Sequence, residues 1–415
     1  MELLVVVAII IAFYMAWNIG ANDVANSMAA AVGSKALSIF WAVILAGICE
    51  FCGAVLVGSH VTDTVRKGII DSQIFTQDPM MLAHGMVCAM LAAALWLNAA
   101  SYLGMPVSTT HSIVGAIVGF GILQAGFSHI YWGKVGAIVA SWFISPITGG
   151  IMAFIIFTQI SRYILSVEKP AIAAHKGVPI CVFFTFTILI LSIIYKGLKN
   201  LHLNLKAPEA MTLSILSGII VSGISAFFIR KSCKCYGELT YEEQLAQVEK
   251  HFAVLVIITS CTVAFAHGAN DVANAIGPLA AVVEIVKYHV VPQKVSIAMW
   301  ILALGGLGIV AGLATFGYRV MRIVGTKVTE ITPSRGVAAN LSTMATVLTC
   351  SRMGLPISTT HTLIGAIIGV GLARGITAID RKIVGSIFTS WIATIPIAAG
   401  LTVLLYLIAR WSLGW

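Results

Sequence analysis

The sequence predicts an all-α polytopic membrane protein with about twelve transmembrane or re-entrant helical segments, arranged in two homologous, inverted repeats. Three observations support this class: the composition, a succession of apolar runs, and two motifs that each occur twice. Apolar residues make up 59% of the 415 residues, charged residues make up 10%, and the mean hydropathy is +0.98. A soluble domain carries about 25% charged and about 45–50% apolar residues. The composition therefore excludes a soluble enzyme and a nucleic-acid binder, and it makes the lipid bilayer a partner of the chain.

The apolar runs give the number of membrane segments. A transmembrane helix needs about 20 apolar residues, so a chain of this length has room for roughly ten to twelve. Twelve runs can be distinguished, at about 3–31, 38–60, 81–103, 107–123, 134–165, 178–197, 209–229, 251–283, 295–317, 336–353, 357–373 and 382–413. The runs at 107–123 and 357–373 are short enough to span or to be re-entrant. The polar stretch at about 230–250 is predicted to be a central cytoplasmic loop.

Two motifs occur twice with nearly constant spacing. The heptapeptide GANDVAN stands at 20–26 and again at 268–274, and the segment 104–121 recurs at 354–371 with 11 of 18 positions identical. We therefore divide the chain into repeat 1 (1–165), a linking insert with two spans and the loop (166–249), and repeat 2 (250–415). Repeat 2 begins seven segments after repeat 1. Because seven is odd, the repeats are expected to have opposite topology, as in many secondary transporters.

The positive charges indicate the orientation. The net charge is +9, and the basic residues lie in short loops. If both termini are outside the cell, 15 of the 25 Lys and Arg residues fall in inner loops. The positive-inside rule then favours a multi-pass protein of the cell membrane with both termini outside.

The first motif places acidic residues inside apolar runs. Asp23, Asp271 and Glu50 are three of the sixteen acidic residues, and they lie well inside such runs. An aspartate costs about 2.5–3.5 kcal/mol at mid-bilayer, so intramembrane acids indicate function. Carboxylate and amide oxygens are hard ligands that suit Na⁺. We predict Na⁺ sites at Asn22, Asp23, Asn270 and Asp271; the alternative is interhelical hydrogen bonding. Glu50 is either a further ion ligand or an interhelical partner.

The same motif predicts an irregular helix. A continuous helix over 3–31 would be about 43 Å long, whereas the hydrocarbon core is about 30 Å thick. The segment is therefore expected to tilt or to break near Gly20, and its copy near Gly268. A break would free backbone carbonyls, which membranes tolerate only inside protein or around a cavity.

The second motif has the features of a helix N-terminus. Pro106, and Pro356 in the copy, precede three hydroxyl residues and an apolar helical run. Free N–H groups and the helix dipole make such an end an anion site. The candidate anion-binding hydroxyls are Ser108, Thr109, Thr110, Ser358, Thr359 and Thr360. The alternative is simple helix capping.

Neither motif contains Lys or Arg, so an anion held by dipoles and bound cations can be released when the cations leave. This property suits a carrier. His111 and His361 follow the hydroxyls and are expected to cap or orient them, with proton transfer as an alternative.

These motifs resemble the signature of the inorganic phosphate transporter family, which includes the type III sodium–phosphate cotransporters. The resemblance covers nearly the whole chain apart from its middle. It implies a usually homodimeric inverted-repeat carrier in which Asp23, Asn26, Asp271, Asn274 and the six hydroxyls form a shared site. We assign Asn26 and Asn274 to phosphate. Glu50 is similar to a glutamate that is important in eukaryotic relatives.

We therefore predict a secondary active transporter that imports inorganic phosphate with Na⁺ as coupling ion, by alternating access and without a cofactor. The alternatives within the family are a proton-coupled phosphate or metal-phosphate symporter and a sulfate permease. A passive anion channel would not need paired buried aspartates. An intramembrane enzyme is not expected, because no catalytic triad spacing can be recognised.

Overall fold

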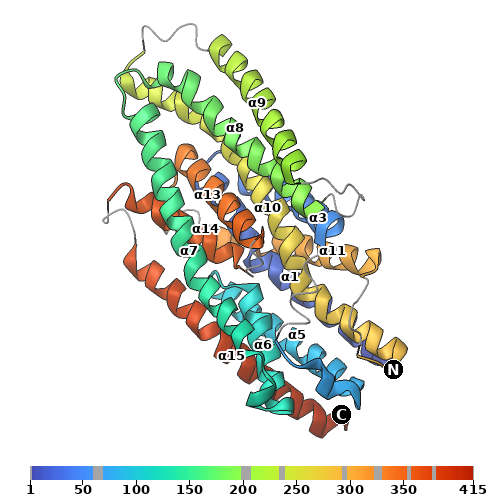
Figure 1. The fold of residues 1–415 in the computed structure, drawn as a ribbon. Coiled ribbons are helices and arrows are strands. Elements are labelled where there is room, and N and C mark those ends of the chain that lie inside the picture. The colour runs from blue at the N-terminus through green and yellow to red at the C-terminus, as the bar shows by residue number, and fades with distance from the viewer. Residues whose placement is uncertain are drawn as a thin grey trace.

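The computed structural model is a long bundle of helices (Figure 1). It describes residues 2–58, 69–197, 207–232, 239–291, 297–321, 330–352, 357–375 and 380–414. The helices are α1 (Glu2–Asn22), α2 (Val24–Gly33), α3 (Ile39–Val57), α5 (Pro79–Tyr102), α6 (Thr109–Ala125), α7 (Trp132–Ile160), α8 (Pro170–Gly197), α9 (Ala207–Ser232), α10 (Tyr241–Tyr288), α11 (Met299–Phe316), α13 (Pro333–Arg352), α14 (Thr359–Leu372) and α15 (Arg381–Leu413). Short helical turns occur at Ser72–Thr76, Phe127–His129 and Ser161–Leu165. The all-α prediction is confirmed.

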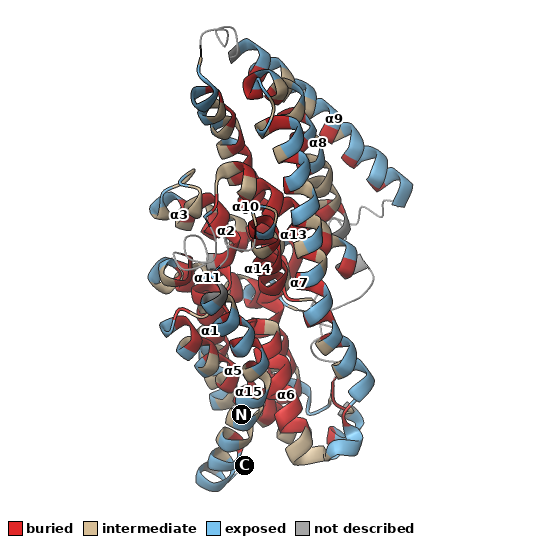
Figure 2. Cartoon of the chain, turned by 90° about the vertical axis from the view of Figure 1, so that its left-hand side faces the viewer, coloured by how far each residue is buried: buried red, intermediate tan, exposed pale blue. Residues whose placement is uncertain are grey.

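The predicted apolar runs all contain helices, but they differ in length. Among the described residues, nine helical stretches are long and apolar enough to cross a membrane. Helices α6 and α14 are apolar but have only 17 and 14 residues. Helix α13 is 20 residues long and is too polar to belong to either group. Both chain termini lie at the same end of the bundle (Figures 1 and 2).

The central polar segment is shorter than the predicted loop at 230–250. Helix α9 continues to Ser232, and α10 already begins at Tyr241. The early start has a local cause: the Thr240 hydroxyl accepts from the Glu243 backbone N–H, and the Glu243 carboxylate accepts from the Thr240 N–H. Such a capping box satisfies free donors at a helix N-terminus. The Cys233–Cys235 stretch of this loop lies outside the described residues.

Helices of the two duplicated segments pack in matched pairs. Helix α7 packs against α14, and α15 packs against α6. In the same way α3 packs against α10, and α1 packs against α11. Each helix of one segment thus contacts a helix of the other, so the bundle is interlocked. The insert helices α8 and α9 form a hairpin beside this core, with much of α9 exposed (Figure 2).

Glycines allow these crossings to be close. A Cβ atom at Gly365 in α14 would overlap the Pro146 backbone of α7, and one at Gly268 in α10 would overlap the Glu50 backbone of α3. At the corresponding crossing of α1 and α11, a Cβ atom at Gly20 would overlap the Ile309 backbone. Small residues let membrane helices approach through their backbones. Because Gly20 and Gly268 hold the same place in the two motifs, Ile309 is the packing counterpart of Glu50.

The helices of the two motifs differ in regularity, and only the first is interrupted, at a single residue. Helix α1 ends at Asn22 and α2 begins at Val24, so Asp23 alone lies between them. Its backbone N–H still donates to the Ile19 carbonyl at 2.9 Å. In the second motif, α10 continues without interruption through Gly268 and Asp271. Of the two expectations, a tilt or a break, the second motif thus shows no break, and α10 is one helix of 48 residues.

Candidate functional site

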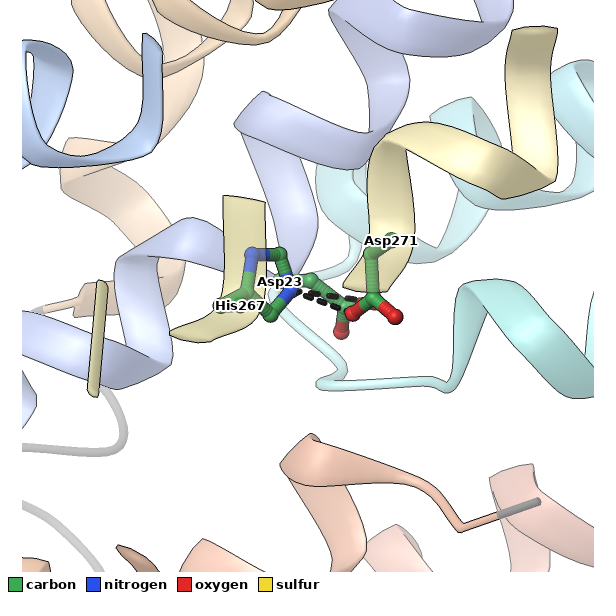
Figure 3. Close-up of side chains that lie close together, drawn as sticks. All are labelled: Asp23, His267 and Asp271. Carbon is green, nitrogen blue, oxygen red and sulfur yellow. Dashed lines mark ion pairs between the residues drawn. The ribbon is translucent and has the colours of Figure 1, made fainter. Parts of the chain in front are cut away.

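Two carboxylates from the two GANDVAN motifs converge on one histidine (Figure 3). The Nε2 atom of His267 lies 2.6 Å from Asp271 Oδ2 and 4.0 Å from Asp23 Oδ2. Its Nδ1 atom lies 3.1 Å from Glu50 Oε2. Asp23 lies between α1 and α2, Glu50 on α3, and His267 and Asp271 on α10. Elements from both duplicated segments thus build one acidic cluster.

The cluster carries an excess of negative charge away from solvent. Asp23, Asp271 and Glu50 are 2%, 5% and 0% exposed. In the part of the chain that the structure describes, their ion pairs are made with His267, which supplies one positive charge at most. Buried charges are costly unless they are compensated. Bound cations are a direct way to compensate the remaining charge.

The donor atoms show what kind of cation fits. One ligand atom each from Asp23, His267 and Asp271 can be chosen so that all three lie within 4.8 Å of one another. Carboxylate and hydroxyl oxygens suit hard cations such as Na⁺, whereas imidazole nitrogen suits transition metals. Both nitrogens of His267 already face carboxylates. The oxygens are therefore the better candidates for cation ligands.

The threonines of the second motif contact these carboxylates. The Thr360 hydroxyl donates to Asp23 Oδ1, and the Thr109 backbone N–H donates to Asp23 Oδ2 at 3.2 Å. The Thr359 hydroxyl donates to Asp271 Oδ2 at 3.2 Å. The N-termini of α6 and α14 thus lie directly beside the acidic cluster. Candidate cation and anion groups are adjacent in space, although they are 86 and 88 residues apart in sequence within the two repeats.

The two motif asparagines reach across to the other repeat. Asn274 Nδ2 donates to the hydroxyls of Thr109 at 3.1 Å and Thr110 at 3.2 Å. Asn26 Nδ2 donates to the Thr360 hydroxyl at 3.4 Å. Asn26 and Asn274 are both 2% exposed. Each asparagine therefore ties its own motif to the hydroxyls of the opposite repeat.

The serines have a capping role. The Ser108 hydroxyl accepts from the His111 backbone N–H at 3.3 Å, and the Ser358 hydroxyl accepts from the His361 N–H at 3.2 Å. Capping, one of the two interpretations of these positions, is thus realised by the serines. The threonines carry the contacts to the carboxylates and asparagines.

The remaining motif amides are placed differently from one another. Asn22 Oδ1 accepts from the Val107 N–H at 3.0 Å, and Asn22 Nδ2 donates to Ser101 Oγ and the Met105 carbonyl at 3.0 Å each. Asn22 thereby holds the extended segment that leads into α6. Asn270 lies half-buried on α10, next to Asp271 in sequence. The role of both amides as Na⁺ ligands stays a prediction.

The two motif histidines pack edge to face and are flanked by tryptophans. The rings of His111 and His361 have centroids 4.3 Å apart. His111 contacts Trp142 at 3.7 Å, and His361 stacks on Trp391 at 3.5 Å. This packing lies where the N-terminal turns of α6 and α14 meet. The expected role of these histidines in capping or orienting the hydroxyls stays a prediction.

Sequence reasoning missed His267. The signal was available: His267 lies four residues before Asp271, so both project from one face of a helix. The duplication concealed it, because Ile19 holds the corresponding place in repeat 1. Its partner Glu50 likewise has Ile309 as packing counterpart. The cluster thus contains one buried His–Glu pair, whereas the corresponding positions of the other half, Ile19 and Ile309, are both isoleucine.

The helical membrane fold and the buried site of charges, hydroxyls and helix N-termini define a membrane transport protein. Residues 19–402 match the model of the Phosphate transporter family, and the chain belongs to that family. It is 46% identical over 400 residues to "Putative phosphate permease TK2061" of Thermococcus kodakarensis, covering 96% of both chains. It is 40% identical over 427 residues to "Inorganic phosphate transporter 2-1, chloroplastic" of Arabidopsis thaliana, covering 97% of this chain and 72% of the relative. A solved structure titled "The sodium-dependent phosphate transporter" superposes with a TM-score of 0.89 at 38% identity and 99% coverage of both chains.

These similarities confirm the predicted family and class. The chain is a multi-pass membrane protein of a transporter family rather than an enzyme. The inverted topology, the membrane in which it resides and the orientation of its termini stay predictions.

Proposed function

We propose that this protein imports inorganic phosphate together with Na⁺ by alternating access. The observation that carries the proposal is the charge of the site: three buried carboxylates and one histidine beside two helix N-termini. A phosphate anion entering this site meets negative charge, so its binding requires accompanying cations. The solved sodium-dependent relative supports Na⁺ as that cation.

Phosphate fits the site better than sulfate does. At neutral pH sulfate only accepts hydrogen bonds, whereas phosphate also donates one through its own hydroxyl group. The site offers donors from the threonines and the helix N-termini, and acceptors from Asp23 and Asp271. A site whose acceptors would be left unpaired discriminates against a ligand without a donor.

A second candidate is proton coupling, and the pair formed by His267 and Glu50 is the observation that favours it. Both are titratable, buried and 3.1 Å apart. A proton taken up there would reduce the negative charge of the cluster much as a bound Na⁺ would.

Uptake measured under separate ion gradients distinguishes these candidates. The purified chain is reconstituted into liposomes, and uptake of radiolabelled phosphate is measured with Na⁺, Li⁺ or proton gradients imposed one at a time. We expect the Na⁺ gradient to drive accumulation against the phosphate gradient and excess sulfate to compete weakly. Uptake that ignores Na⁺ and follows the proton gradient would replace Na⁺ coupling by proton coupling.

The oligomeric state belongs to the same proposal. The exposed apolar face of α9, with Ile219, Ile220 and Phe227, leaves surface for lipid or for a second copy. We expect a homodimer, and the mass of the purified protein in detergent tests it.

A further inference from the structure

Buried polar side chains fill the contact between α10 and α13. Asn340 of α13 donates from Nδ2 to the hydroxyls of Thr259 at 3.0 Å and Ser260 at 2.9 Å on α10. Thr343 and Thr262 lie one turn closer to the site. All five side chains are 4% exposed or less. Asn340 and Thr343 contribute to the polarity of α13, which does not count among the apolar spans.

The corresponding contact in repeat 1 lacks these groups. Helices α1 and α5 pack together as α10 and α13 do. The repeat offsets of 248 and 250 residues align Thr259, Ser260, Thr262, Asn340 and Thr343 with Ile11, Ala12, Tyr14, Met90 and Ala93. Nearer the site, repeat 1 has the polar residue of an aligned pair: Asn18 aligns with Ala266 of repeat 2. Helix packing alone is achieved in repeat 1 without the polar set, so packing does not account for it.

Two further observations describe the polar groups of this contact and its distance from the site. The Oδ1 atom of Asn340 is buried without a hydrogen-bond partner, and buried polar atoms are rarely left unpaired. A cavity of about 10 Å³ is lined by four hydroxyl residues, Thr262, Thr343, Ser192 and Thr359, together with Val263, Ala266, Met344, Val347 and Leu348. This volume is close to the minimum for one water molecule. Thr359 belongs to the candidate phosphate site, so the polar contact reaches that site.

The outer end of the polar contact lies toward the central loop. There the Glu249 carboxylate of α10 accepts from the Ser334 N–H and hydroxyl of α13, at 2.9 and 2.7 Å. Between Glu249 and Thr262 the α10 helix rises by about 20 Å at 1.5 Å per residue. The polar side chains of α10 occupy about the inner quarter of that distance, and buried apolar side chains, among them Phe252 and Val256, lie farther out.

From these observations we infer that the α10–α13 contact is the path along which phosphate leaves the site toward the central-loop side. The path is closed in this conformation, and it opens when α13 separates from α10. Its hydroxyl and amide groups replace part of the water that surrounds the anion. An apolar contact such as α1–α5 would leave the anion's oxygens without partners. This inference rests on the proposed phosphate transport.

Transport and binding measured on the same variants test the path. We expect Thr343→Val and Asn340→Leu to lower the rate of Na⁺-driven phosphate uptake at least about tenfold, while equilibrium phosphate binding in detergent changes less than about twofold. Thr343→Ser keeps the hydroxyl and should transport normally. The matched control is Ala93→Val, which places valine at the corresponding position of repeat 1 and should also transport normally. Normal transport by Thr343→Val and Asn340→Leu, or equal loss of binding and uptake, would overturn the path.

Chemical access gives a second measurement that does not depend on transport rate. Thr343→Cys and Ala93→Cys are treated, in vesicles of known sidedness, with a membrane-impermeant thiol reagent on the central-loop side. Peptide mass spectrometry then reads the modification at the introduced cysteine, so the native cysteines do not interfere. We expect labelling at 343 and none at 93; equal labelling at both, or none at 343, contradicts the path. A wild-type chain that neither binds nor moves phosphate would instead refute the proposed function itself.

Discussion

The Nδ2 atom of Asn274 lies 3.1 Å from the hydroxyl of Thr109, so an amide of the second repeat donates to the first turn of α6 in the first. Asn26 makes the reciprocal contact with Thr360. The site therefore has no side that belongs to one repeat alone. A movement of one repeat against the other changes the distances between its donors and acceptors. This arrangement supports the proposed alternating access, because a movement that opens the site also separates the donors and acceptors that hold the ligand.

The aspartates are the first test of the cation role. Asp23→Asn and Asp271→Asn keep the side-chain size and one acceptor oxygen but remove a charge. We expect each to reduce Na⁺-driven phosphate uptake at least tenfold, equivalent to about 1.4 kcal/mol. Membrane insertion should be normal, since removing a buried charge makes insertion easier. Uptake into proteoliposomes at low Na⁺ is the measurement.

Asp78→Asn is the matched control for these variants. Asp78 caps α5 by accepting from the Met81 N–H, and asparagine caps a helix about as well as aspartate does. Its uptake should equal that of the wild type. If Asp23→Asn and Asp271→Asn also transported normally, the cation assignment would be wrong.

The hydroxyl residues are expected to act on phosphate rather than on Na⁺. Thr359→Ala removes a donor to Asp271, and Ser108→Ala removes the cap of α6. We expect both to weaken phosphate affinity several-fold, because a neutral hydrogen bond contributes about 0.5–1.5 kcal/mol. Na⁺ binding measured without phosphate should be nearly unchanged. Thr359→Ser restores the hydroxyl and should restore affinity; a larger effect on Na⁺ than on phosphate would reverse the assignment.

Much of this site could be predicted from the sequence because both motifs occur in both repeats. Asp23 and Asp271 are conspicuous as acids inside apolar runs, and the hydroxyls after Pro106 mark a helix N-terminus. Sequence spacing alone could not show that Asn26 and Asn274 cross to the opposite repeats, since that depends on how the helices interlock. Nor could sequence spacing distinguish the serines, whose hydroxyls cap the helices, from the threonines, whose hydroxyls contact the carboxylates and asparagines.

The features that the sequence did not reveal are those that break the duplication. His267 and Glu50 have no polar counterparts, so the search for repeated residues passed over the histidine. A tilt or a break was expected in both motifs; the first helix is interrupted only at Asp23, and α10 continues without interruption through the second motif. Such differences follow from packing between distant segments, which the local pattern does not record.

The close helix crossings give a prediction about stability. Gly365→Ala adds a Cβ atom that would overlap the Pro146 backbone, whereas a Cβ atom at Gly136 meets nothing within 4 Å. Overpacking typically costs about 1–3 kcal/mol, while alanine in place of an exposed helical glycine gains up to about 1 kcal/mol. We expect Gly365→Ala to lower the unfolding temperature in detergent and Gly136→Ala to leave it unchanged or raise it. Equal unfolding temperatures for the two variants would show that the α7–α14 crossing is looser than described.

The pair of His267 and Glu50 gives the last prediction, which uses the two isoleucines at the corresponding positions of the other half as its reference. Glu50→Ile removes one partner and leaves His267 with the two aspartates, whereas His267→Ile leaves the buried Glu50 unpaired. Breaking a buried charged pair from one side costs about 3–5 kcal/mol, while replacing both partners by apolar groups is often close to neutral. We therefore expect the double variant to unfold at a higher temperature than the His267→Ile variant. It should nevertheless lose at least about tenfold in phosphate uptake, because the site then lacks two of its titratable groups.

Thermal unfolding of the wild type and the three variants at one fixed Na⁺ concentration forms a double-mutant cycle that isolates the coupling between the two residues. If the effects of the single variants simply add in the double variant, the two side chains do not form an energetically coupled pair.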